Sequence, residues 1–187
     1  LHTCQLLEDS GFEVTYLQVN AEGIVDPETL MNAITDKTIL ISVMLANNET
    51  GVIQPIPEIA AVAKEQGALI HCDAVQAPGR IPFDVNTLGI DLLSISAHKF
   101  GGPKGAGLLY IRRGTPFFPQ QIGGGQERNR RAGTENVSGI IGLSVALSQA
   151  EKGRTEFVYY VSKLRDQFIK NVLASIPGSV LNGSPHD

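Results

Sequence analysis

Four short apolar segments alternate with helix-forming segments along this sequence, and this alternation constrains the fold more than any other feature. The apolar segments are 38–45, 68–73, 91–96 and 107–112. The first of them, TILISVML, is almost continuously apolar, which is typical of a strand buried on both faces. Strands that alternate with helices predict an α/β fold, in which a mostly parallel sheet is flanked by helices.

Helix signals occupy the segments between and beyond these strands. Asp26-Pro27-Glu28 combines a capping aspartate, a proline at the first helical position and an acid near the positive end of the helix dipole. We expect helices at 1–10, 26–35, 57–66 and 136–175, the last with a break near Gly153. Two more short strands are expected at 13–17 and 178–181. Residues 114–135 are expected to form a long loop, and loops of this length are usually functional.

Composition and charge exclude several classes of protein. A net charge of −4 argues against a broad nucleic-acid surface, and no apolar run is long enough to cross a membrane. Cys4 and Cys72 are too few for a disulfide framework or a zinc site, so we interpret both as packing residues and expect no metal. Free cysteines and the lack of a visible export signal favour the cytoplasm. Leu1 begins inside a helical pattern, so we expect an internal piece of a longer chain.

Polar side chains follow three of the expected strands at the point where each strand ends. They are Asn47 and Asn48 after the first, Asp73 and Gln76 after the second, and Ser96, His98 and Lys99 after the third. Ligands of open α/β sheets bind at the carboxyl ends of the strands. We therefore expect these side chains to converge on one site.

The third group contains the most informative residue, Lys99. A lysine at the end of a buried strand loses hydration, which lowers its pKa and makes its amine a nucleophile toward carbonyl groups. Pyridoxal phosphate is the common aldehyde partner, and it needs a carboxylate beside its ring nitrogen, a role that suits Asp73. Ser96 and His98 are placed to hold the phosphate, and the glycines after Lys99 allow close approach of the backbone. Each residue alone also has an ordinary explanation: a turn aspartate, a structural histidine, a flexible glycine loop.

Four sequence blocks resemble one known family. SISAHKFGGPKGAGLLYIRRG is similar to the cofactor-lysine segment of cysteine desulfurases of the NifS and IscS type, in the class V aminotransferase group. LANNETGVIQPI, IHCDAVQAPGRIPFDV and IGGGQERNRRAGTENV resemble further blocks of that family, in the same order. The resemblance implies fold type I of the pyridoxal phosphate enzymes. It also implies that residues 1–135 are part of the large cofactor domain and that 136–187 are a linking helix with the start of a smaller α+β domain.

The resemblance also implies roles for residues at the strand ends. Lys99 would hold pyridoxal 5'-phosphate through a Schiff base and then move protons. Asp73 would pair with the pyridine nitrogen, and Gln76 would hydrogen-bond the ring phenolate. Asn48 would contact the ring oxygen or the substrate carboxylate.

The remaining roles concern the phosphate. Ser96 and His98 would bind it, and His98 stands beside Lys99 as a candidate catalytic residue. Thr134 would reach the phosphate of the partner subunit's cofactor, which implies a homodimer with shared sites.

The reaction implied is the conversion of L-cysteine to L-alanine, with the sulfur left as a persulfide on an enzyme cysteine. Neither Cys4 nor Cys72 matches that cysteine, so we expect these 187 residues to have no turnover alone. The sulfur would pass to an acceptor such as an iron–sulfur scaffold protein. Three alternatives remain open: a selenocysteine lyase, another class V aminotransferase, and a non-catalytic scaffold for sulfur-transfer partners.

Overall fold

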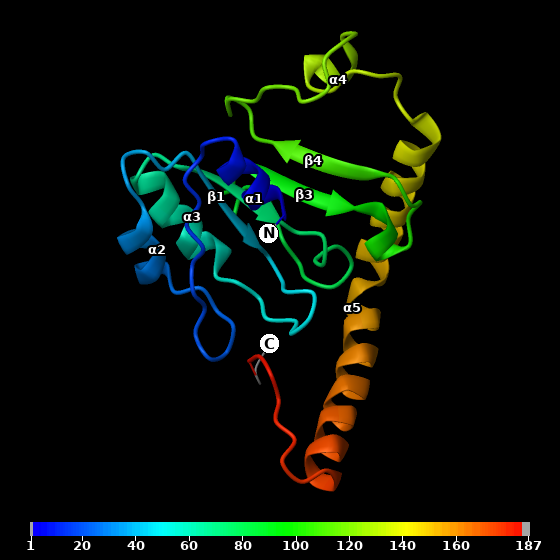
Figure 1. Ribbon diagram of the computed structural model, residues 1–187. Coiled ribbons are helices and arrows are strands. Elements are labelled where there is room, and N and C mark those ends of the chain that lie inside the picture. The colour runs from blue at the N-terminus through cyan, green and yellow to red at the C-terminus, as the bar shows by residue number, and fades with distance from the viewer. Residues whose placement is uncertain (1, 185–187) are drawn as a thin grey trace.

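The computed structural model describes residues 2–184, and its centre is a four-stranded sheet in the order β1-β2-β3-β4 (Figure 1). The strands are β1 (Leu40–Met44), β2 (Leu69–Asp73), β3 (Leu92–Ser96) and β4 (Gly107–Ile111). β1, β2 and β3 are parallel, and β4 is antiparallel to β3. All four apolar segments therefore contain strands, and the prediction of a mostly parallel sheet flanked by helices is confirmed.

Four helices lie close to their expected places: α1 (His2–Asp9), α2 (Pro27–Ala33), α3 (Ile56–Glu65) and α5 (Val137–Ser175). The 3-10 helix η1 (Ala97–Phe100) and the short α4 (Gln126–Asn129), which lies in the expected loop, were not predicted. Asp26 caps α2 as expected, because its Oδ1 accepts a hydrogen bond from the backbone N of Glu28 at 2.9 Å. Gly67 follows α3 with a φ of +75°, a conformation that favours glycine over other residues. Leu1, which belongs to the first expected helix, and residues 185–187 lie outside the described part.

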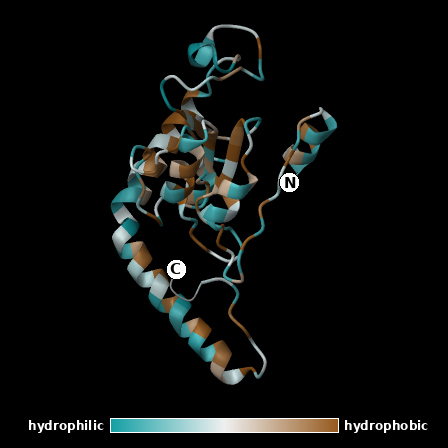
Figure 2. Ribbon diagram, turned by 90° about the vertical axis from the view of Figure 1, so that its left-hand side faces the viewer, coloured by the Kyte–Doolittle hydropathy of each residue, from teal (hydrophilic) through white to brown (hydrophobic). Residues whose placement is uncertain are grey.

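The core lies on one face of the sheet. α3 packs against β2, and α2 packs against α3. Ile56 and Ile59 of α3 and Ile70 and Cys72 of β2 are essentially inaccessible to solvent. Figure 2 shows apolar residues gathered between these helices and the strands, while α1 stands apart from the sheet.

The opposite face of β1 is open, which corrects one expectation. Burial alternates along the strand, with Ile41 buried but Leu40 47% exposed and Ser42 exposed. Burial on both faces was therefore wrong for this strand among the described residues. The apolar run indicated a strand correctly, but the number of layers covering it depends on distant segments that a local pattern does not contain.

Three further expectations about secondary structure were wrong. The segments 13–17 and 178–181 contain no strand, because an alternating pattern makes a strand only where a neighbouring strand supplies backbone partners. In the first of them Tyr16 is exposed rather than packed in a sheet. α5 passes through Gly153 without a break over its 39 residues, since one glycine weakens a helix by about 1 kcal/mol and does not end it.

α5 packs very closely against the segments that follow β2 and β3. A Cβ atom at Gly102 would lie 2.8 Å from Cβ of Ala97 and 3.2 Å from Cβ of Ala146 in α5. A Cβ atom at Gly79 would lie 2.8 Å from Cβ of Ala150. Gly102 thus brings α5 against η1, and Gly79 brings it against the turn after β2. Gly102 therefore serves helix packing rather than the approach to a cofactor expected from the sequence.

Substitution of Gly102 by alanine is expected to destabilise the fold by about 1–3 kcal/mol, because the added methyl group overpacks the contact with Ala97 and Ala146. Gly153→Ala is the matched control in α5. A Cβ atom there meets nothing within 4 Å, so a stability gain of up to about 1 kcal/mol is expected. Urea unfolding followed by circular dichroism measures both. Equal effects of the two substitutions would contradict the packing explanation.

Candidate active site

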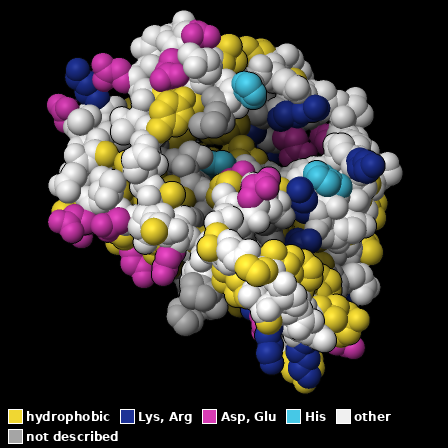
Figure 3. Space-filling model, turned by 60° about the horizontal axis from the view of Figure 1, so that its bottom comes forward, with side chains coloured by type: hydrophobic (Ala, Val, Ile, Leu, Met, Phe, Trp, Pro, Cys, Tyr) yellow, Lys and Arg dark blue, Asp and Glu magenta, His cyan; other side chains and the backbone are white. Residues whose placement is uncertain are grey.

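The carboxyl ends of β1, β2 and β3 lie at one edge of the sheet. Met44 pairs with Asp73, and Asp73 pairs with Ser94, two residues before the end of β3. The side chains that follow these strands therefore share one edge, as expected. Figure 3 shows acidic, basic and histidine side chains gathered around a hollow on this side of the molecule.

Asp73 is the last residue of β2 and is half-buried. Its Oδ1 accepts a hydrogen bond from the backbone N of Val75 at 3.0 Å, which fixes the carboxylate at the end of the strand. Gln76 lies three residues further on, half-buried in the turn that leads to Gly79. The two side chains thus occupy the same strand end.

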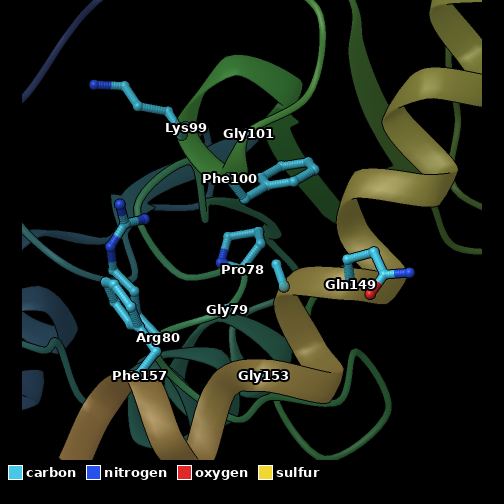
Figure 4. A pocket seen from close by; sticks show the side chains of 10 residues that line it. Pro78, Gly79, Arg80, Lys99, Phe100, Gly101, Gln149, Gly153 and Phe157 are labelled. Atoms are coloured by element: carbon cyan, nitrogen blue, oxygen red, sulfur yellow. The ribbon is translucent and has the colours of Figure 1, made fainter. Parts of the chain in front are cut away.

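The β3 end carries Ser96, His98 and Lys99 in and before η1. The Ser96 hydroxyl lies 2.9 Å from Nδ1 of His98, and η1 ends at Gly101, whose φ is +83°. Lys99 is half-buried at its base. In Figure 4 its amine extends to the side of η1 opposite the ring of Phe100, which points toward α5.

A pocket of about 380 Å³ lies on the Phe100 side of η1, between the turn after β2 and α5 (Figure 4). It is lined by Pro78, Arg80, Phe100, Phe157 and the base of Lys99, among others. The Lys99 amine extends away from Pro78 and Phe100. The candidate site is therefore the strand-end edge and not this pocket.

The loop after β1 is held by Asn47 rather than Asn48. Oδ1 of Asn47 accepts hydrogen bonds from the backbone N of Glu49 at 2.8 Å and of Thr50 at 2.9 Å. Asn48 is exposed, and its amide donates only locally, to the Glu49 carboxylate at 3.0 Å. Asn48 lies at the expected edge, where its side chain is exposed.

The structure does not place Thr134 beside the other predicted site residues. β4 starts beside Ser96 and runs back to Ile111, which pairs with Leu92 at the amino end of β3. The loop that carries Thr134 therefore begins at the opposite edge of the sheet, and Thr134 is exposed. In the same loop Glu127, Arg128 and Asn129 adopt positive φ values of 46°, 57° and 62°, which is rare for residues other than glycine.

His71 is a polar residue of this region that sequence reasoning missed. It lies on β2 two residues before Asp73, with the Ser42 hydroxyl 2.8 Å from its Nδ1 and the Ser94 hydroxyl 2.8 Å from its Nε2. Burial lowers the pKa of His71, and the nearby Asp73 carboxylate only partly offsets this. The sequence did contain a signal for this cluster, because Ser42, His71 and Ser94 are polar residues inside otherwise apolar strands.

Cys72 is buried in the core, and burial raises the pKa of its thiol to about 12. At pH 8 only about one thiol in 10⁴ is then ionised, and the thiolate is the reactive form. We expect iodoacetamide at pH 8 to leave Cys72 unmodified in the native protein and to modify it in urea. The partly exposed Cys4 is the comparison, and peptide mass spectrometry distinguishes the two. Rapid native labelling of Cys72 would contradict its assignment as an inert packing residue.

No helix within residues 2–184 combines the length and apolar character needed to cross a membrane, including the long α5.

Comparison with known proteins gives consistent matches. The family profile described as Aminotransferase class-V matches residues 1–187. Cysteine desulfurase IscS of Methanosarcina thermophila is 56% identical over 185 residues, which cover 99% of this chain and 46% of that protein. The solved structure of a NifS-like protein has a TM-score of 0.89 at 42% identity, covering 92% of this chain and 48% of that one. The structure titled "SspA in complex with cysteine" has a TM-score of 0.77 at 40% identity, covering 87% and 48%. The chain thus spans about half the length of these relatives.

Proposed function

Since the chain belongs to the class-V aminotransferase family, we propose that it is the cofactor-binding part of a pyridoxal phosphate-dependent cysteine desulfurase. The full-length protein would convert L-cysteine to L-alanine and leave the sulfur as a persulfide on a cysteine of the enzyme. The observation that carries the proposal is the register of β2 and β3. It places Asp73 on the strand next to the one that leads into Ser96, His98 and Lys99.

The residues at this edge fit the cofactor. Pyridoxal phosphate needs an amine for its aldehyde, a carboxylate for its ring nitrogen and donors for its phosphate. Lys99 offers an amine that extends freely from η1, and Asp73 offers a half-buried carboxylate. Once bound, the cofactor supplies an electron sink for bonds at the substrate α-carbon.

The hydrogen bond between Ser96 and His98 suggests how the phosphate is held. When the Ser96 hydroxyl donates to Nδ1 of His98, the imidazole proton lies on Nε2. Nε2 is then a donor available to an anion, and His98 is exposed enough to use it. In this arrangement Lys99 binds the cofactor and moves protons, while Gln76 and Asn48 orient the ring and the substrate.

Thr134 belongs to a second part of the proposal, a homodimer. It lies in the loop that starts at the edge of the sheet opposite the site. It is exposed there, which supports a role toward the cofactor phosphate of a second copy rather than its own. Three further points stay predictions. They are the division of the chain into 1–135 and 136–187, a sulfur acceptor such as an iron–sulfur scaffold protein, and the cytoplasmic location.

The test uses the full-length protein with pyridoxal phosphate, L-cysteine and a reductant. We expect alanine and sulfide in equal amounts, together with visible absorbance from bound cofactor. Bound cofactor without alanine would move the proposal to a selenocysteine lyase or another class V aminotransferase, which selenocysteine and keto-acid acceptors then distinguish. A protein that takes up no cofactor would be a scaffold. The 187 residues alone are expected to form no alanine.

A further inference from the structure

His71 connects the three parallel strands on the open face of the sheet. Its ring lies between Ser42 of β1 and Ser94 of β3, with 2.8 Å from a ring nitrogen to each hydroxyl. Alternation along β2 and β3 places His71 on the same face as Asp73, and Ser94 on the same face as Ser96. We call the side chains of Ser42, His71 and Ser94 the His71 rung. It lies directly beneath the candidate site.

Both hydrogen bonds of the His71 rung can form while the imidazole ring is uncharged. Burial lowers the pKa of His71, so its ring is neutral at neutral pH and has one donor nitrogen and one acceptor nitrogen. One serine hydroxyl then donates to the ring and the other accepts from it. A neutral ring beneath Asp73 leaves the charge of that carboxylate available to a positive group above it.

The two serines of the rung lie at different positions along the strand direction. Ser42 pairs directly with His71, whereas Ser94 pairs with Asp73. The bond from His71 to Ser94 therefore runs diagonally toward the carboxyl edge and ends beside Asp73. The bond to Ser42 joins His71 to β1, which leads to Asn48 and not to Lys99.

The pairing of β2 with β3 is also the shortest in the sheet. It consists of three residue pairs, from His71–Leu92 to Asp73–Ser94, whereas β1–β2 and β3–β4 have five pairs each. β2 carries the Asp73 carboxylate and β3 leads to the Lys99 amine, so their relative position sets the geometry of the site. The His71–Ser94 bond adds a side-chain link at this pairing.

We propose that His71 is a positioning residue, which through Ser94 holds Asp73 at the distance from Lys99 that the cofactor ring requires. The inference rests on the proposed function, because it names what the strand spacing serves. It assigns to His71 no contact with substrate or cofactor. It predicts that the two halves of the rung differ in their effect on cofactor binding.

The first test measures cofactor affinity by absorbance titration of full-length apoprotein, alongside the melting temperature. Ser94→Ala is expected to raise the dissociation constant for pyridoxal phosphate about tenfold, since the loss of one hydrogen bond shifts an equilibrium by up to about tenfold. Ser42→Ala is expected to raise it less than about twofold. Ser94→Thr keeps the hydroxyl and is expected to restore affinity to within about threefold of the wild type. The absorbance maximum of bound cofactor should move in Ser94→Ala only.

A second pair of variants addresses His71 itself. His71→Gln keeps a polar group near the position of Nε2 and should retain most of the affinity. His71→Asn keeps one near Nδ1 and should lose affinity as Ser94→Ala does. Wild-type affinity in both Ser94→Ala and His71→Asn, or affinity losses that only follow the melting temperature, would overturn the inference. A wild-type protein that binds no pyridoxal phosphate would overturn the proposed function itself, and the inference with it.

Discussion

Replacing Lys99 with alanine is expected to lower the rate of alanine formation from L-cysteine by at least about a thousandfold in the full-length protein. Among the side chains proposed to hold the cofactor, Lys99 alone carries an amine, the group that can bond the cofactor aldehyde covalently and then move protons. Its removal leaves the fold intact, because the Lys99 side chain extends away from Phe100 and α5 (Figure 4).

Lys104→Ala is the matched control for this prediction. Lys104 is an exposed lysine in the turn between η1 and β4, five residues after Lys99. We expect its substitution to change the rate less than about twofold, as is usual for an exposed side chain without special contacts. Alanine and sulfide are quantified together, and the visible absorbance of bound cofactor is recorded. A Lys99→Ala protein that keeps a tenth of the wild-type rate would contradict the assignment of the reactive lysine.

Replacing Asp73 with asparagine is expected to lower kcat about 10²- to 10³-fold, because a neutral amide no longer stabilises positive charge on the cofactor ring nitrogen. The fold should be preserved. The asparagine Oδ1 can still accept the hydrogen bond that Asp73 accepts from the backbone N of Val75.

Asp91→Asn is the matched control for Asp73. Asp91 precedes β3 at the opposite edge of the sheet, and its Oδ2 accepts a hydrogen bond from the backbone N of Ile70 at 3.0 Å. Both substitutions exchange a half-buried carboxylate for an amide that keeps a backbone contact. Only Asp73→Asn should change kcat and the absorbance of bound cofactor. Equal losses in the two variants would show that the effect comes from the sheet and not from the charge at the site.

The sequence was sufficient for the parts of the fold that depend on local pattern. The four apolar runs are long enough to identify strands, and the Asp26-Pro27-Glu28 cap identified the start of α2. The family resemblance carried by four sequence blocks is confirmed by a match over residues 1–187. The placement of Asp73, Ser96 and Lys99 at one edge of the sheet also followed from the sequence, because the carboxyl ends of parallel strands share an edge.

What the sequence did not reveal depends on distant neighbours. The segment 13–17 alternates as a strand does, but pairing requires a second strand that a local pattern does not show. Gly102 was interpreted as room for a cofactor, whereas the atoms it accommodates belong to Ala97 and Ala146. His71 drew no interpretation because its two partners are 29 and 23 residues away along the chain.

Because α5 is closely packed at only one part of its length, a small tilt there displaces the far end of the helix by several ångströms. Its first half is clamped where Ala146 and Ala150 meet Gly102 and Gly79, and its second half leaves the body of the protein (Figure 1). From Ala150 to Ser175 the helix extends about 37 Å at 1.5 Å per residue. A tilt of about 5° at the clamp therefore moves the far end by about 3 Å.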